Sequence, residues 1–207
     1  MVRIIVGADG PIAPAIAEAV DALRAGRVVA FPTDTLYGLA VDPRRPDAVE
    51  RLFRLKGRDA RTAVPLVAAT LEQAMLVANF TERERRAAAA FWPGPLTIVA
   101  PANSAVTPEA RGGQGTVAIR VPAHEIARAL AREFEFPITA TSANRSGQPA
   151  ADSADSVAAV LPDVDVLVDG GRAPGGAPST IISFDDMRPI LLREGAVSWE
   201  RVIKSLR

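Results

Sequence analysis

Two short polar segments carry side chains of the kinds that hold phosphate groups. Lys56-Gly57-Arg58 supplies two cations, and Ser142-Ala143-Asn144 supplies a hydroxyl and an amide. Together they can neutralise and hydrogen-bond polyphosphate oxygens, and they suit such a ligand better than a carbonyl or a metal ion. The chain has no G-x-x-x-x-G-K-[ST] motif and no G-x-G-x-x-G motif after a strand. The sequence therefore predicts a less common way of binding a nucleotide.

Another polar group follows a predicted strand. The segment 31–39 contains Thr33, Asp34, Thr35 and the single tyrosine, Tyr37. Open α/β sheets bind ligands at such strand ends, so the segment is a candidate binding turn. A turn in which Thr and Asp cap their own backbone is the alternative.

Arg120 is the charged residue of an otherwise apolar strand, 116–121. Thr116 and Arg120 share a face of this strand, because alternate residues point the same way. A buried arginine needs a partner, since an unpaired buried charge is costly. A ligand carboxylate bound bidentately would serve, and so would an internal Asp or Glu.

Three further positions carry polar groups at predicted loops or strand ends. The stretch 139–147 is rich in hydroxyls, Ser179 follows the Gly-rich loop 169–176, and Arg193 follows a short apolar strand. A polar turn or a surface salt bridge is the alternative for each. His124 is interpreted as a residue at a helix start and not as a base.

Composition limits the class of protein. The 207 residues are 48% apolar, which predicts one folded domain over 1–207. The formal net charge is zero, so the chain has no general attraction for nucleic acid. The absence of cysteine excludes disulfides and thiolate metal sites, and the single histidine excludes a multi-histidine centre. With no signal peptide and no apolar run of roughly 18 residues, a cytoplasmic protein without membrane contact is expected.

The candidate residues are positioned by alternating strands and helices. Gly57 is a natural left-handed stop for one helix, and Thr81 with Glu84 forms a capping box for another. Several late strands follow one another without helices, so the pattern predicts an α/β fold with a mixed sheet. The predicted strands are 2–6, 28–31, 65–69, 96–100, 116–121, 137–140, 164–168, 180–184 and 189–192, and the predicted helices are 13–25, 47–55, 81–91, 126–134, 157–161 and 198–206.

Seven segments of this chain, in the same order, resemble those of the YrdC/TsaC family of threonylcarbamoyl-AMP synthases. They cover nearly the whole chain, and their order makes the resemblance specific. It implies a single-domain α/β fold: a twisted mixed β-sheet with flanking helices around a concave basic cleft, in the short form of the family. The segments are 31–39, 56–58, 91–97, 116–122, 141–147, 179–182 and 192–195.

The resemblance also implies an activity. Members of the family convert L-threonine, bicarbonate and ATP to threonylcarbamoyl-adenylate and pyrophosphate, which serves threonylcarbamoyladenosine (t6A) formation in tRNA. Mg²⁺ held mainly by the ATP phosphates is the implied cofactor. Downstream tRNA threonylcarbamoyl-transfer proteins are the implied partners, and a weak direct contact with tRNA or other RNA is left open.

Roles carry over from the family position by position. The implied threonine-binding residues are Thr33, Thr35, Tyr37, Arg120, Ala140 and Ser179. The implied ATP-binding residues are Lys56, Arg58, Thr116, Ser142, Asn144 and Arg193, and the catalytic residues among them are Lys56, Arg58, Ser142 and Asn144. The chain departs from the family pattern in three places: Asp59 replaces a common Pro, no His aligns near 65–69, and Ala150 replaces a nucleotide-contacting Ser.

Two other functions compete with this interpretation. A non-catalytic module could bind double-stranded RNA or tRNA by shape, but the zero net charge weighs against a dedicated RNA binder. A carbamoyl-transfer domain of the hydrogenase-maturation kind would be expected beside zinc-binding cysteines, and this chain has no cysteine.

Overall fold

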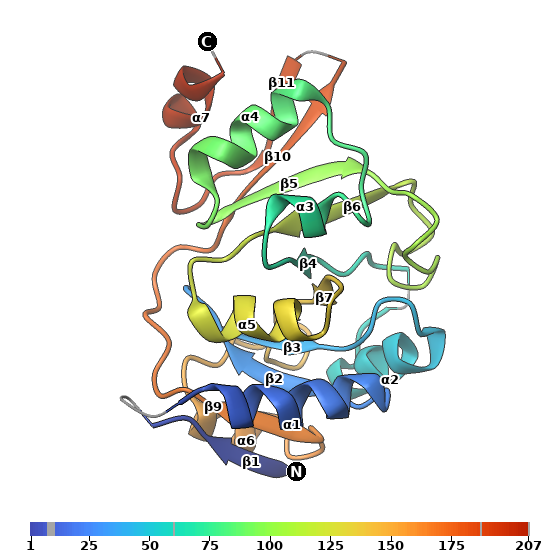
Figure 1. The fold of residues 1–207 in the computed structure, drawn as a ribbon, viewed down its shortest axis with the longest axis vertical. Helices are drawn as coiled ribbons and strands as arrows, with labels where there is room; N and C mark the ends of the chain where they lie inside the picture. The colour runs from blue at the N-terminus through green and yellow to red at the C-terminus, as the bar shows by residue number, and fades with distance from the viewer. Residues whose placement is uncertain (8–10, 60, 187, 207) are drawn as a thin grey trace.

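The strands of the protein form two mixed sheets that lie one beyond the other along the long axis of the molecule (Figure 1). The computed structural model describes residues 1–7, 11–59, 61–186 and 188–206. The predicted α/β class with mixed strand directions is confirmed. The strands are divided between two sheets, however, where a single sheet was expected.

The five-stranded sheet has the order β1-β9-β2-β3-β8. The first three strands in this order, β1, β9 and β2, run parallel to one another. β3 is antiparallel to both β2 and β8. The segment 31–39, expected as a turn after one strand, contains a hairpin in which Pro32 pairs with Tyr37. The polar turn 33–36 therefore lies at the tip of this hairpin. The strands are β1 (Val2–Ile5), β2 (Val29–Pro32), β3 (Tyr37–Ala40), β8 (Thr141–Ser142) and β9 (Val166–Asp169).

The six-stranded sheet has the order β11-β10-β5-β6-β4-β7. Its central strand β5 is antiparallel to β6 and parallel to β10. The short strand β4 runs parallel to β6, with Val67 beside Arg120. Arg120, at the end of β6, therefore lies next to β4, which in turn lies next to the edge strand β7. The strands are β4 (Leu66–Val67), β5 (Leu96–Pro101), β6 (Thr116–Arg120), β7 (Ile138–Thr139), β10 (Thr180–Asp185) and β11 (Arg188–Arg193).

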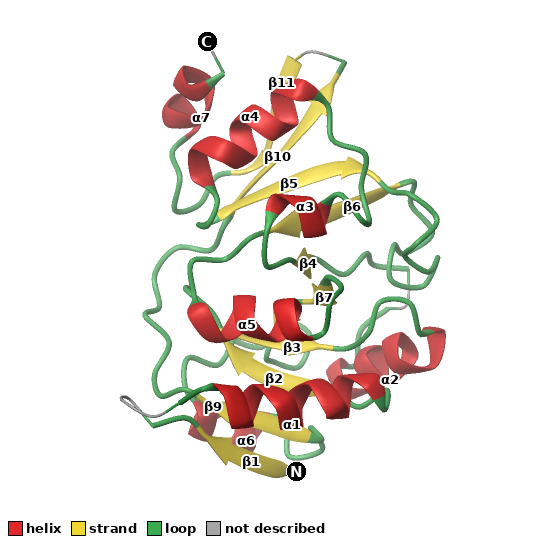
Figure 2. Ribbon diagram, in the orientation of Figure 1, coloured by secondary structure: helices red, strands yellow, loops and turns green. Residues whose placement is uncertain are grey.

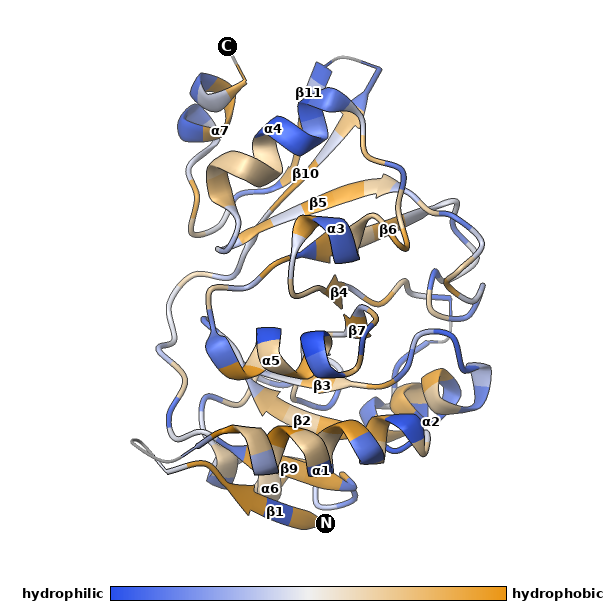
Figure 3. Ribbon diagram, viewed as in Figure 1, coloured by the Kyte–Doolittle hydropathy of each residue, from blue (hydrophilic) through white to orange (hydrophobic). Residues whose placement is uncertain are grey.

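Helices cover both sheets (Figure 2). α1 and α5 pack together over β2 and β9, and α4 packs on β5 with α7 beside it. The helices combine apolar and polar side chains, whereas most strands are apolar (Figure 3). None of the described helices is long and apolar enough to cross a membrane. The helices are α1 (Ala13–Arg24), α2 (Pro46–Lys56), α3 (Leu71–Ala74), α4 (Glu82–Phe91), α5 (Glu125–Glu133), α6 (Ala154–Val160) and α7 (Trp199–Ser205).

Two predicted helix boundaries are confirmed. Thr81 accepts a hydrogen bond from the Glu84 backbone N–H, and the Glu84 carboxylate accepts one from the Thr81 backbone N–H at 2.5 Å, which is the capping box. Gly57 ends α2 with φ of 59°, in the left-handed region that glycine adopts without steric cost. Arg58 therefore leaves the helix in a fixed direction.

Three chain segments and one helix connect the sheets. The segment 41–65 leads from β3 of the five-stranded sheet to β4 of the six-stranded sheet. Ala140 alone separates β7 of the six-stranded sheet from β8 of the five-stranded sheet. The segment 170–179 leads from β9 to β10, and α5 contacts both β2 and β4. One contiguous cluster of buried apolar residues runs through both sheets. The relative position of the two sheets is thus set by covalent crossings and by shared packing.

Candidate functional site

A cavity of about 320 Å³ lies between the two sheets, at the lower end of the range for small-molecule sites. Its lining combines hydroxyl, apolar and cationic side chains. Of the described residues that line it, three are arginines and none is Asp or Glu. The lining residues are Thr33, Thr35, Leu36, Tyr37, Gly38, Arg58, Pro65, Leu66, Val67, Thr97, Arg120, Ala140, Thr141, Ser142, Pro178, Ser179, Ile181 and Arg193.

The hairpin tip contributes two hydroxyls to the cavity. The Thr33 hydroxyl donates to the Leu36 carbonyl at 2.6 Å and lies 3.1 Å from the Thr35 hydroxyl. Backbone N–H groups of Thr35 and Leu36 approach the Thr33 hydroxyl at 3.2 and 3.3 Å. The local capping considered from the sequence therefore exists, and it holds Thr35 at the cavity wall.

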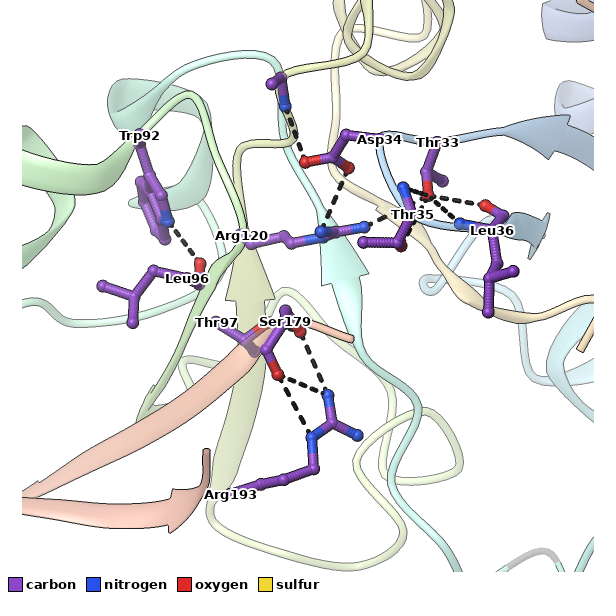
Figure 4. A network of polar contacts seen from close by, with 11 residues as sticks. Thr33, Asp34, Thr35, Leu36, Trp92, Leu96, Thr97, Arg120, Ser179 and Arg193 are labelled. Carbon is purple, nitrogen blue, oxygen red and sulfur yellow. Dashed lines mark hydrogen bonds and ion pairs between the residues drawn. The ribbon is translucent and has the colours of Figure 1, made fainter. Parts of the chain in front are cut away.

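Arg120 enters the cavity from β6, in the opposite sheet (Figure 4). It is 9% exposed, and its Nη1 lies 3.2 Å from Asp34 Oδ1, so the internal carboxylate considered from the sequence is present. Burial lowers the pKa of Arg120, the charge of Asp34 opposes that change, and the charge of Arg193 adds to it. A desolvated guanidinium at a cavity wall can bind a carboxylate strongly.

Ser179 and Arg193 form the wall made by the late strands. Arg193 donates to the Ser179 carbonyl from Nη2 at 2.7 Å and from Nε at 3.2 Å, and Nη2 lies 3.3 Å from the Ser179 hydroxyl. Thr97, on β5, donates to the Ser179 hydroxyl at 2.9 Å. The Ser179 residue is thus held from two strands (Figure 4), and like Arg120 it lines the cavity.

Arg58 is the third cation of the cavity. Its Nη1 donates to the Thr141 hydroxyl at 3.1 Å and its Nη2 to the Ala63 carbonyl at 3.0 Å. Burial lowers the pKa of this guanidinium. Since neither contact is to a carboxylate, the positive charge of Arg58 is available to an anionic ligand.

Lys56 lies behind the cavity and not in its lining. Its Nζ donates to the Ser142 carbonyl, to the Asn144 carbonyl at 2.9 Å and to Asn144 Oδ1 at 3.1 Å. Lys56 is 3% exposed, and burial, with the nearby charge of Arg58, lowers its pKa to about 8. The two segments singled out first, 56–58 and 142–144, are therefore joined by this ammonium group.

The structure brings together nine of the twelve residues predicted for the site and leaves three outside the cavity lining. Lys56 and Asn144 lie behind it, as part of the network just described. Thr116 is exposed at the start of β6, about 13 Å along the strand from Arg120. The nine residues in the lining are Thr33, Thr35, Tyr37, Arg58, Arg120, Ala140, Ser142, Ser179 and Arg193.

Sequence reasoning assigned no role to Thr97 or to Asp34 at the site. Thr97 is 4% exposed and lies between apolar neighbours of β5. A hydroxyl in an apolar strand must find a hydrogen-bond partner, and this was the signal that could have marked Thr97 as a site residue. Asp34 stood between two predicted site residues. Its contact with Arg120 depends on how the two sheets are placed, which no local pattern encodes.

The part of the chain that the structure describes contains no group of three or more His, Asp or Glu side chains arranged to hold a metal ion. The cavity lining offers hydroxyls, carbonyls and cations. Such groups fit phosphate or carboxylate oxygens and do not form a cage for Mg²⁺, which prefers carboxylate and water ligands. These residues by themselves do not fit a resident metal.

The fold and the cavity define an α/β protein with a pocket between two mixed sheets that is lined by arginines and hydroxyl side chains. A family model described as "Telomere recombination", covering the Sua5, YciO and YrdC proteins, matches residues 21–195. The chain belongs to this family.

Two curated relatives and one solved structure agree with this placement. The chain is 41% identical over 184 residues to the threonylcarbamoyl-AMP synthase of Pyrococcus abyssi (strain GE5 / Orsay), covering 88% of this chain and 54% of that protein. It is 38% identical over 167 residues to the threonylcarbamoyl-AMP synthase of Chromohalobacter salexigens, covering 80% and 90%. The chain thus spans about half the length of the Pyrococcus relative.

The solved structure is that of P. abyssi Sua5 complexed with L-threonine. The two structures superpose with a TM-score of 0.93 at 39% sequence identity, over 99% of this chain and 61% of that one. The two-sheet architecture is therefore shared with a protein whose complex with an amino acid is known.

Proposed function

We propose that this chain is an L-threonylcarbamoyladenylate synthase. It makes threonylcarbamoyl-AMP and pyrophosphate from L-threonine, bicarbonate and ATP, and the product serves t6A formation in tRNA. The names of the relatives support this activity. The observation that carries the proposal is the cavity between the sheets, where three arginines meet seven hydroxyl-bearing side chains and no lining carboxylate among the described residues.

The amino-acid side of the cavity is assigned to the hairpin tip and Arg120. The Arg120 guanidinium would hold the threonine carboxylate, while Thr33, Thr35 and Ser179 offer hydroxyls and Tyr37 and Ala140 complete the wall. Bound in this way, the threonine amine stays free to react. Carbamate formation, in which the amine nitrogen bonds to the carbon of bicarbonate and water leaves, needs little beyond proximity and orientation, which such a wall supplies.

The ATP side is assigned to Arg58, Arg193 and Ser142, supported by the network of Lys56 and Asn144. A carbamate oxygen attacks the α-phosphorus, the bond from that phosphorus to the bridging oxygen breaks, and pyrophosphate leaves. Negative charge on the α-phosphoryl oxygens and on pyrophosphate is stabilised by fixed guanidinium groups. Thr116 remains a proposed ATP contact outside the cavity lining.

Mg²⁺ would arrive on the phosphates of ATP, where it neutralises charge, because the described residues do not form a cage for it. The proposal has three further parts. The protein acts in the cytoplasm, it passes its product to tRNA-modifying partner proteins, and it makes a weak direct contact with RNA. Each follows from the proposed product, and none is a property of the cavity itself.

The proposal is tested by mixing the purified protein with ATP, Mg²⁺, L-threonine and bicarbonate. Pyrophosphate release should require both threonine and bicarbonate. Arg120→Ala should raise the KM for threonine by about tenfold or more and change the KM for ATP little, because a charged hydrogen-bonding partner of the substrate is lost. Arg51→Ala is the control, since Arg51 pairs with Asp165 outside the cavity.

Release that proceeds equally without threonine or without bicarbonate would overturn the proposed activity. Equal effects of Arg120→Ala on the KM values of both substrates would overturn the assignment of Arg120 to the threonine carboxylate. An effect of Arg51→Ala as large as that of Arg120→Ala would show that general loss of a cation, and not a specific contact, is being measured.

A further inference from the structure

Asp34 is a carboxylate that approaches Arg120 from the other sheet. It lies at the tip of the β2–β3 hairpin, whereas Arg120 ends β6, and Oδ1 of Asp34 is 3.2 Å from Nη1 of Arg120 (Figure 4). The Asp34 side chain is 14% exposed and does not belong to the cavity lining. It therefore lies behind the guanidinium as seen from the cavity.

The other oxygen of Asp34 is anchored independently. Oδ2 accepts a hydrogen bond from the backbone N–H of Ala123 at 3.3 Å, just after the end of β6. The carboxylate thus ties the hairpin tip to the segment that follows β6. A carboxylate fixed at both oxygens holds its position when a ligand enters the cavity.

The hydrogen-bonding capacity of Arg120 is only partly used. Among the described residues, Nη1 of Arg120 and Oδ1 of Asp34 are both buried without a hydrogen-bond partner, so their contact is an ion pair without good hydrogen-bond geometry. One weak bond links Nη2 of Arg120 to the Thr33 hydroxyl at 3.5 Å. A guanidinium has five N–H donors, and since Nη1 is buried against Asp34, the donors of the other two nitrogens remain for a ligand.

We propose that Asp34 is a positioning residue for Arg120 and that it determines the preference of the cavity for a substrate with a free carboxylate. This inference rests on the proposed function. The ion pair offsets the cost of burying Arg120 next to Arg193 and fixes the guanidinium at the wall, with donors left for the substrate. Without the Asp34 charge, two neighbouring cations repel each other and Arg120 loses its fixed direction.

The opposite role would be competition, in which Asp34 occupies the place of the substrate carboxylate. The geometry favours positioning for two reasons. Asp34 lies outside the cavity lining, and its second oxygen is held by the Ala123 N–H. The two roles predict opposite signs: removing a positioning charge weakens threonine binding, whereas removing a competitor strengthens it.

The test uses Asp34→Asn, which keeps the size of the side chain and an oxygen acceptor for the Ala123 N–H but removes the charge. Binding of L-threonine and of L-threoninamide, which lacks the carboxylate, is measured by calorimetry, together with the KM values for threonine and ATP. Threonine affinity should fall by about tenfold or more, because the partner of a buried charge is lost. The KM for ATP and the affinity for threoninamide should change less than about twofold.

Asp42→Asn is the matched control, since Asp42 is also buried and pairs with an arginine, Arg44, at 2.9 Å outside the cavity. It should leave the preference for threonine over threoninamide unchanged. Asp34→Glu retains the charge and should retain most of this preference, so it also tests the proposal if Asp34→Asn folds poorly.

Unchanged or tighter threonine binding in Asp34→Asn would overturn the proposal. So would equal losses of threonine and threoninamide affinity, or the same loss of preference in Asp34→Glu as in Asp34→Asn. These outcomes are separate from failure of the proposed function, which would appear in the unmodified protein as pyrophosphate release that does not need threonine and bicarbonate.

Discussion

At the scale of single residues, the site depends on cations, of which Lys56 and Arg120 are buried away from water. Lys56 shows this most clearly, because its ammonium is 3% exposed and is bound by oxygens of Ser142 and Asn144. Three acceptors match the three donors of a charged ammonium. When the proton is lost, one acceptor loses its partner, so the shape of the 142–144 turn is linked to the ionisation of Lys56.

Lys56 should titrate near pH 8 in the folded protein, well below its ordinary pKa of 10.5, because burial and Arg58 disfavour its charge. From pH 8 to 10.5 the unfolded chain keeps the proton that the folded chain has released. The contribution of Lys56 to the free energy of unfolding is therefore least favourable below pH 8 and rises with pH through this window. Carbon-13 NMR of the lysine Cε atoms measures the titration directly.

The sequence contains two lysines, so the spectrum should contain two Cε signals. Lys204→Arg assigns them, since Lys204 is exposed on α7, far from the 142–144 turn in sequence. A midpoint for Lys56 near 10.5 would contradict the lowered pKa that burial and the charge of Arg58 are expected to cause.

At the scale of elements, the end of α2 sets the direction of Arg58. Gly57 adopts φ of 59°, its N–H donates to the Arg54 carbonyl at 3.2 Å, and the Arg58 N–H donates to the Phe53 carbonyl at 3.0 Å. This bonding pattern closes the helix and turns the chain sharply. Lys56 and Arg58 thereby point to different surroundings, one behind the cavity and one into it.

Gly57→Ala should lower the free energy of unfolding by about 1 kcal/mol, because a Cβ is strained at this φ. A Cβ at Gly57 would meet no other atom within 4 Å, so the cost is one of backbone conformation alone. Urea denaturation measures it. Pyrophosphate release should fall by about threefold or more, because Arg58 is displaced.

Gly113→Ala is the matched control for Gly57→Ala. Gly113 has φ of 73°, a Cβ there also meets nothing within 4 Å, and the residue lies outside the cavity lining. The Gly113→Ala variant should lose a similar amount of free energy of unfolding and keep the full rate of pyrophosphate release. Equal loss of activity in both variants would contradict a specific role for the end of α2.

The sequence predicted most elements because their signals are local. The capping box at Thr81 and Glu84 and the glycine stop at Gly57 each depend on a few neighbouring residues. The strands β3 and β8 were not predicted. Tyr37–Ala40 pairs with β2 in a hairpin, but its sequence indicates part of a polar turn, and Thr141–Ser142 is short and becomes a strand by pairing with β3, about a hundred residues earlier. For the same reason the contact of Asp34 with Arg120 could not be read from the sequence.

At the scale of the whole molecule, the cavity is shared by two sheets, and the segment 170–179 passes beside it. Several bonds hold this segment. The Tyr37 hydroxyl donates to the Gly171 carbonyl at 2.6 Å, the Gly175 N–H donates to the Thr35 carbonyl at 2.9 Å, and the Ala173 N–H donates to the Asp152 carbonyl at 2.7 Å. Burial and the charge of Asp169 raise the pKa of Tyr37 to about 12, so this hydroxyl stays a donor at neutral pH.

Tyr37→Phe should loosen the segment 170–179 by removing one of the bonds that hold it, at a cost of about 1 kcal/mol. Local opening would expose the bond after Arg172, and trypsin should release the fragment 1–172 about fivefold faster. Mass spectrometry follows the fragment, and Arg172→Gln, which should abolish it, identifies the site of cleavage. An unchanged rate in Tyr37→Phe would mean that the hydroxyl does not restrain the segment.

The wall formed by Ser179 and Arg193 has a consequence for the synthesis of the protein on the ribosome. The hairpin tip with Thr33 and Thr35 emerges early, but Arg193 lies on β11, and β10 must first pair with β5, which is more than eighty residues earlier in the chain. Contacts so distant in sequence form late in folding. We therefore expect a nascent chain to acquire its binding cavity only after β11 has been made. An incomplete chain should accordingly bind no substrate.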